Sequence, residues 1–169
     1  TLKECLKVTR AACSEYADML LEAGADAVCI VDGIAGPDIL DPRDFSALIK
    51  PEYEKFCRAG KGIKIIHVCG NSTPILNSLS ECGFNGISIE EKVSDLQVAK
   101  SFVGKKTNLI GNLSSSGILL RGSCEEIKAE ARKCLEEKID MLAPGCGIAP
   151  NTPTKNLRAL VEARDEYYI

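Results

Sequence analysis

Short apolar runs alternate with segments of helical periodicity along the whole chain. A continuous apolar run of this kind is typical of a parallel strand that is buried on both faces of a sheet. Five such runs occur, and their sequences are ADAVCIVD, IKIIHV, FNGISIE, TNLIG and DMLAP. Helical spacing and capping residues predict helices over residues 2–23, 44–59, 73–82, 94–102, from 123 onward and 153–166. The alternation predicts an α/β fold with a parallel sheet, organised as a single domain over residues 1–169.

Three helix starts carry specific capping signals. Thr73 precedes Pro74, so we expect Thr73 to cap its helix and Pro74 to occupy the first turn. Ser123 is followed three residues later by Glu126, which is the spacing of a capping box. Thr152 is the expected cap of the last helix.

Two arrangements of parallel strands fit this pattern: an open doubly wound sheet and part of a (β/α)₈ barrel. A whole barrel needs eight strands and about 200–250 residues or more, and this chain has 169 residues. The first predicted helix has no strand before it, as a cut through a barrel would leave. We therefore expect a fragment of a larger barrel.

Polar residues collect at the carboxyl end of every predicted strand. They are Asp32, His67, Cys69, Glu90, Glu91, Asn112 and Cys146. Barrels and open α/β sheets both build their sites at this edge. In a barrel the strand ends converge on one axis, whereas an open sheet spreads them along a line. Because convergence is the easier way to bring Cys146 to His67, this pattern favours the barrel.

The residues best suited to chemistry are His67, Cys69 and Cys146. His67 is the only histidine and lies two positions before Cys69, while Cys146 lies in the Gly-rich sequence PGCG. Three ligands of this type with an open fourth position describe a catalytic zinc site. The alternatives are a hydrogen-bonded buried histidine near a chance cysteine, and a cysteine chosen for its small size in a tight turn.

Composition narrows the class of protein. The chain is 45% hydrophobic and 27% charged, with a formal net charge of −3, as expected of a globular protein with a sizeable core. Its mild acidity gives no reason to expect nucleic acid or a membrane surface as a partner. No apolar run approaches the ~20 residues of a membrane span, and no signal peptide is recognisable, so we expect a cytoplasmic protein. The nine cysteines include no CxxC pair and are interpreted as reduced thiols.

Four segments together resemble the uroporphyrinogen decarboxylase superfamily: HVCGN, GISIEEKV, LIGNL and LAPGCGIAPNTPTKNLRALVEA. Within it they are most similar to the corrinoid-protein:coenzyme M methyltransferases, because members that decarboxylate porphyrins lack the H-x-C…C set. The resemblance implies a (β/α)₈ TIM barrel of which this chain forms the C-terminal five βα units. It implies zinc held by His67, Cys69 and Cys146, and transfer of a methyl group from a methylcobamide on a partner corrinoid protein to the thiol of coenzyme M, a step of methanogenesis.

The resemblance also extends the candidate site. Glu90 ends the neighbouring strand and is the candidate catalytic residue, as a fourth zinc ligand that the substrate thiol would displace; its alternative role is a salt bridge or helix cap. Coenzyme M carries a sulfonate, for which the loop GNLSSSGILLRGS offers Asn112, Ser114, Ser115, Ser116 and Arg121. Of these, Asn112, Ser114 and Arg121 are the candidate contacts. A serine-rich loop ordered only by packing explains these three residues equally well.

Three other functions fit the same sequence less closely. One is a related enzyme that methylates another thiol or a pterin acceptor, or that decarboxylates a porphyrin. Another is a non-catalytic zinc-binding module, which would have a fourth permanent protein ligand. The third is a corrinoid-binding partner, but its D-x-H-x-x-G pattern is absent from the chain.

Overall fold

The computed structural model describes residues 1–169 and contains one five-stranded parallel sheet. The strands are β1 (Ala27–Asp32), β2 (Ile63–Val68), β3 (Gly86–Ser88), β4 (Asn108–Leu113) and β5 (Met141–Pro144). Each strand pairs with the next one along the chain, so the order in the sheet is β1-β2-β3-β4-β5. A doubly wound sheet reverses its strand order at a switch point, and this sheet has no reversal. The consecutive order is that of an arc of a barrel.

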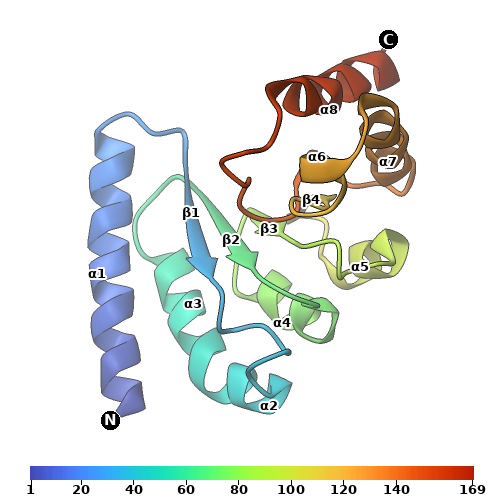
Figure 1. Ribbon diagram of the computed structural model, residues 1–169. Coiled ribbons are helices and arrows are strands. Elements are labelled where there is room, and N and C mark those ends of the chain that lie inside the picture. The colour runs from blue at the N-terminus through green and yellow to red at the C-terminus, as the bar shows by residue number, and fades with distance from the viewer.

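The helices alternate with the strands, as expected, and lie in an arc around the sheet (Figure 1). They are α1 (Leu2–Glu22), α2 (Pro42–Asp44), α3 (Lys50–Arg58), α4 (Leu76–Glu81), α5 (Leu96–Phe102), α6 (Ile118–Arg121), α7 (Cys124–Glu136) and α8 (Thr154–Tyr167). The short helix α6 has no counterpart among the predicted helices. No helix combines the length and the apolar character that crossing a membrane requires.

The helix predicted over residues 44–59 is interrupted. A π-helical turn, Phe45–Ile49, separates α2 from α3. Pro51 follows this turn in the first turn of α3. Proline has no amide hydrogen to donate and its ring clashes with the preceding turn of an α-helix. The wider π turn accommodates the chain just before that position.

The capping predictions have mixed outcomes. The Ser123–Glu126 capping box is present, and Pro74 occupies the first turn of its helix. Thr73 is not a cap, because its own amide donates to the Asn71 side chain and the helix begins with a 3₁₀ turn after Ser72. The prediction of Thr152 is also wrong: α8 begins after Pro153, without a side-chain cap.

The two faces of the sheet differ in their burial. On β1, Val28 is buried whereas Cys29 and Val31 are exposed. Side chains alternate between faces along a strand, so the helices cover one face and leave the other open. Val31 pairs in register with His67, and His67 with Ser88. The side chain of His67 therefore belongs to the open face, near its carboxyl edge.

The covered face carries the main hydrophobic core. Its largest members are aromatic: the rings of Tyr53 and Phe84 meet edge to face at 5.5 Å, and Tyr53 meets Phe45 in the same way at 6.0 Å. A smaller core joins α6, α7 and α8 to the end of β4. Leu142 of β5 packs against both cores. This packing fixes the strand ends from which the candidate site is built.

Candidate metal centre

Four side chains meet at the carboxyl edge of the sheet: His67, Cys69, Glu90 and Cys146. One nitrogen, sulfur or oxygen atom of each lies within 4.8 Å of those of the other three. His67 is on β2, Cys69 directly follows β2, Glu90 is two residues after β3, and Cys146 is two residues after β5. The sheet thus brings together residues that are up to 79 positions apart in the sequence, and does so at the edge where parallel sheets build their sites.

His67 presents a defined nitrogen to this group. Its Nδ1 atom lies 3.0 Å from the hydroxyl oxygen of Ser88, and its Nε2 atom lies 3.5 Å from the Cys69 sulfur. His67 is 6% exposed. Because Nδ1 is engaged with Ser88, Nε2 is the nitrogen available to a metal ion.

The donor set fits zinc. Imidazole nitrogen, thiolate sulfur and carboxylate oxygen are all zinc ligands, and tetrahedral zinc with bonds of about 2.0–2.3 Å holds its ligand atoms roughly 3.3–3.8 Å apart. Burial, with neighbouring Cys146 and Glu90, raises the pKa of the Cys69 thiol to about 11. Negative charge on these neighbours opposes ionisation of Cys69, and a cation among them would relieve that repulsion. Both the chemistry and the charge of the group therefore suit a divalent metal ion.

The loop that carries Cys146 is held by Ser115. The Ser115 hydroxyl donates to the Cys146 carbonyl at 2.9 Å and accepts from the Cys146 amide at 3.0 Å. Gly145, the preceding residue, lies against the neighbouring loop, where an added Cβ would be 3.2 Å from the Glu90 Cα atom. The close approach of these two loops brings Cys146 to Glu90.

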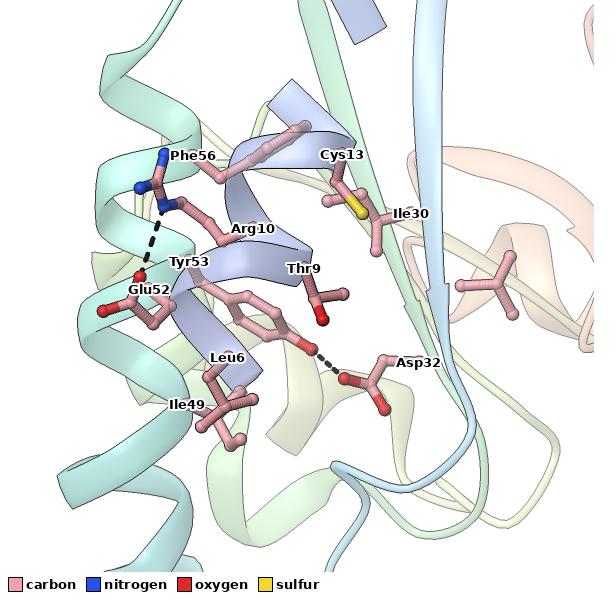
Figure 2. A pocket seen from close by; sticks show the side chains of 11 residues that line it. Leu6, Thr9, Arg10, Cys13, Ile30, Asp32, Ile49, Glu52, Tyr53 and Phe56 are labelled. Atoms are coloured by element: carbon pink, nitrogen blue, oxygen red, sulfur yellow. Dashed lines mark hydrogen bonds and ion pairs between the residues drawn. The ribbon is translucent and has the colours of Figure 1, made fainter. Parts of the chain in front are cut away.

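The loop after β1 lies against Cys69, where an added Cβ on Gly33 would be 3.8 Å from the Cys69 sulfur. The Asp32 carboxylate accepts hydrogen bonds from the amides of Ile34 and Ala35, both at 2.9 Å, and so caps this loop. Figure 2 shows the Tyr53 hydroxyl pointing at Asp32, to which it donates at 2.7 Å. Burial raises the pKa of Tyr53, so this hydroxyl keeps its proton and remains a donor.

Two cavities lie near these loops. One of about 250 Å³ borders the metal centre and is lined by Gly33, Gly36, Asp38, Ile39, Cys69, Gly70, Glu90 and Lys92. The other, of about 170 Å³, lies between α1, β1 and α3 and contains none of the four clustered side chains (Figure 2). A ligand that reaches Cys69 and Glu90 therefore has space in the first cavity.

The three predicted sulfonate contacts lie outside the group of four. The Asn112 amide donates to the carbonyls of Glu90 and Val93, at 3.3 and 2.9 Å. The Ser114 hydroxyl donates to the Glu91 carboxylate at 2.9 Å. Arg121 ends α6, is exposed and has no side-chain hydrogen bond or ion pair. Asn112 and Ser114 thus hold the segment that carries Glu90, and their role in binding a sulfonate stays a prediction.

Two contacts of the site were not predicted from the sequence: that of Ser88 with His67 and that of Ser115, considered only as a sulfonate contact, with Cys146. Ser88 stands two residues before Glu90, on the strand next to His67. The two-residue period of a strand places such a residue on the same face as Glu90, so this signal was available. Ser115 has no comparable signal, because its contact with Cys146 joins two loops that are 31 residues apart.

Comparisons with known proteins converge on one family. A family model described as Uroporphyrinogen decarboxylase (URO-D) matches residues 1–167. The methylcobamide:CoM methyltransferase MtaA of Methanosarcina barkeri is 43% identical over 166 residues, which cover 98% of this chain and 49% of that relative. The methylcobamide:CoM methyltransferase MtbA of Methanosarcina acetivorans is 33% identical over 155 residues, which cover 90% of this chain and 45% of the relative.

A solved structure gives the same result. A methyltransferase from Methanosarcina mazei matches with a TM-score of 0.96 and 44% sequence identity, over 99% of this chain and 50% of that chain. The chain therefore spans about half the length of the curated relatives it matches.

Proposed function

Because this chain belongs to the uroporphyrinogen decarboxylase family, we propose that it takes part in transferring a methyl group from a methylated corrinoid protein to the thiol of coenzyme M. The observation that carries the proposal is the group of His67, Cys69, Glu90 and Cys146, whose donor atoms lie within 4.8 Å of one another. The similarity to two methylcobamide:CoM methyltransferases supports this reaction over others of the family.

In this proposal His67, Cys69 and Cys146 hold a zinc ion. A bound zinc ion would supply Lewis acidity, which lowers the pKa of a thiol ligand so that it binds as the nucleophilic thiolate. Two cysteine ligands and one histidine keep the charge on such an ion low, so a third sulfur would stay electron-rich. The geometry supports Nε2 as the ligand atom of His67, since Ser88 engages Nδ1.

Glu90 is the proposed catalytic residue. Its carboxylate lies in the group with both thiols and borders the 250 Å³ cavity. A carboxylate oxygen is the hardest donor of the four, and it is the one we expect a substrate thiol to replace. Release of the carboxylate would also leave a base close to the thiol as its proton departs. The methyl group would then form a bond to sulfur as its bond to cobalt breaks, and the electron pair of that bond would remain on cobalt.

Only one of the three residues predicted to contact the sulfonate of coenzyme M is a cation, and it has no ion-pair partner. Arg121 has no ion-pair partner, whereas Asn112 and Ser114 are bonded to the segment around Glu90. We propose Arg121 as the charged contact of the three. Its replacement by alanine is expected to raise the KM for coenzyme M and to leave zinc content unchanged.

The first test is the metal content of the purified protein by mass spectrometry. We expect about one zinc per chain, and its loss in the variants Cys69→Ala and Cys146→Ala. Cys29→Ala is the matched control, since Cys29 is an exposed free thiol outside the group. Methylation of coenzyme M by methylcobalamin, measured on the same proteins, tests the reaction. Folded protein without zinc, or zinc indifferent to both variants, would remove the basis of the proposal.

A further inference from the structure

His67 is oriented by a single side chain, that of Ser88. The Ser88 hydroxyl lies 3.0 Å from Nδ1 of His67 and has no other hydrogen-bond partner within the chain. The two residues are also register partners on adjacent strands, so the contact joins rigid elements rather than loops. With Nδ1 held at the Ser88 hydroxyl, Nε2 is the ring nitrogen that faces the group of Cys69, Glu90 and Cys146.

Cys146 is oriented in a different way, through its main chain. Cys146 lies two residues beyond β5, where no sheet hydrogen bond holds it. Ser115 is 4% exposed, and its hydroxyl bonds both the amide and the carbonyl of Cys146. Two bonds to one residue fix both the position and the orientation of that residue, and hence the starting point of its side chain.

We propose that Ser88 and Ser115 are the positioning residues of the metal centre, which hold His67 and Cys146 in the ligating arrangement before the metal ion arrives. The proposal rests on the proposed function, because it assumes a metal ion bound by these ligands. Partners that orient metal ligands in this way typically change metal affinity 10–100-fold when they are removed. Neither serine donates an atom to the group of four, so each acts through the residue it holds.

Removal of each serine hydroxyl should weaken metal binding through a different ligand. Loss of the Ser88 hydroxyl frees the His67 ring to rotate and to exchange its tautomer, which weakens the nitrogen ligand. Loss of the Ser115 hydroxyl leaves the amide and carbonyl of Cys146 without their partner, which displaces a sulfur ligand. The signature of cobalt(II) substituted for zinc separates these cases, because its charge-transfer bands report sulfur ligation and its d–d bands report the overall geometry.

The experiment uses purified protein loaded with cobalt(II) or with zinc. Zinc affinity is measured by chelator competition, and the cobalt spectrum is recorded, for Ser88→Ala, Ser88→Thr, Ser115→Ala and Ser115→Thr. Ser46→Ala is the control, because the exposed Ser46 hydroxyl bonds a main-chain carbonyl, that of Pro42, far from the metal ligands in sequence. Thermal unfolding of the metal-free proteins identifies any variant that fails to fold.

We expect Ser88→Ala and Ser115→Ala to lose roughly tenfold or more in zinc affinity. Ser88→Ala should alter the d–d bands, Ser115→Ala should weaken the sulfur charge-transfer bands, and the threonine variants should recover both properties. Folded alanine variants with the affinity and spectrum of Ser46→Ala would overturn the positioning role alone. Parent protein that binds no zinc, or binds it independently of Cys69 and Cys146, would instead overturn the proposed function and this inference with it.

Discussion

Gly36 lies so close to Cys69 that a Cβ atom on Gly36 would come within 2.4 Å of the Cys69 carbonyl oxygen. Gly33, in the same loop, is the other close neighbour: a Cβ atom on Gly33 would lie 3.8 Å from the Cys69 sulfur. Side chains do not tolerate a contact as short as the first one, so glycine at position 36 is a condition for this packing. The loop after β1 and the loop after β2 therefore fit together only at the present separation.

We expect Gly36→Ala to displace the Cys69 loop, lower the free energy of unfolding by about 1–3 kcal/mol and weaken zinc binding. Gly147→Ala is the matched control, because a Cβ atom on Gly147 would meet nothing within 4 Å although the residue adjoins Cys146. Urea unfolding and metal content measure the two effects. Equal unfolding free energies and equal metal contents of the two variants would contradict this prediction, because they would show that the loop accommodates a methyl group at position 36 without losing stability.

The sequence predicted the sheet and the group of four for the same physical reason. Buried parallel strands are apolar throughout, and this makes a polar residue at or just beyond the carboxyl end of a strand conspicuous, as with His67 and Cys146. Glu90 was found by the same rule, although β3 is shorter than predicted and ends at Ser88. The strand ends therefore included all four residues of the group, together with Asp32, Glu91 and Asn112, which lie outside it.

Contacts between loops could not be predicted in this way. Asn112 was predicted as a sulfonate contact, and the hydrogen bonds of its amide to the carbonyls of Glu90 and Val93 were not predicted. The contact of Ser115 with Cys146 and the tight approach of Gly36 to Cys69 likewise depend on how separate loops are placed. Nothing in the local pattern of polar and apolar residues carries that information.

A second prediction concerns Lys64 of β2, which is 4% exposed and whose ammonium group lies at the end of α3. Its ammonium group donates to the carbonyls of Phe56, Cys57 and Ala59, and lies 5.0 Å from the centre of the Phe56 ring. These carbonyls include acceptors that the helix end leaves free. We expect Lys64→Met to lower the free energy of unfolding by about 1–3 kcal/mol, because buried acceptors lose their donor.

The dependence of this stability loss on salt concentration tests whether it comes from hydrogen bonds to carbonyls. Lys64 has no carboxylate partner, so the loss in Lys64→Met should be nearly the same at low and high ionic strength. Lys61→Met, at an exposed position three residues earlier, should change the free energy of unfolding by less than about 0.5 kcal/mol. Urea unfolding at two salt concentrations measures both variants. A loss that disappears in salt would point to a surface ion pair instead.

A third prediction concerns stability at alkaline pH. Burial raises the pKa of the Cys82 thiol to about 12, from an ordinary value near 9.0, and the residue is 4% exposed. Between these values the folded chain holds a proton that the unfolded chain has lost. Stability from this group is therefore complete below pH 9 and falls as pH rises, by about 1.4 kcal/mol per pH unit for one thiol.

Replacement of the thiol should flatten that dependence. Burial also raises the pKa of the Cys57 thiol to about 12, and this thiol is left in place in Cys82→Ala. About half of the pH dependence of the free energy of unfolding that the two thiols cause should therefore remain. Urea unfolding of the parent and of Cys82→Ala at several values between pH 8 and pH 11 measures the slopes. Parallel curves for the two proteins would mean that Cys82 ionises as easily in the folded chain as in the unfolded one.

The last prediction decides what Asn112 does. Its amide hydrogens support the main chain at Glu90 and Val93, and its oxygen accepts from the Cys134 thiol at 3.5 Å. Asn112→Ala leaves buried carbonyls without a donor, so we expect a loss of about 1–3 kcal/mol in the free energy of unfolding, together with weaker zinc binding through displaced Glu90. Asn77→Ala is the control, since the exposed Asn77 side chain bonds only Glu81 and should cost far less. If Asn112→Ala instead unfolds like the parent protein and only raises the KM for coenzyme M, Asn112 is a substrate contact, because a residue that supports the main chain cannot be removed without a loss of stability.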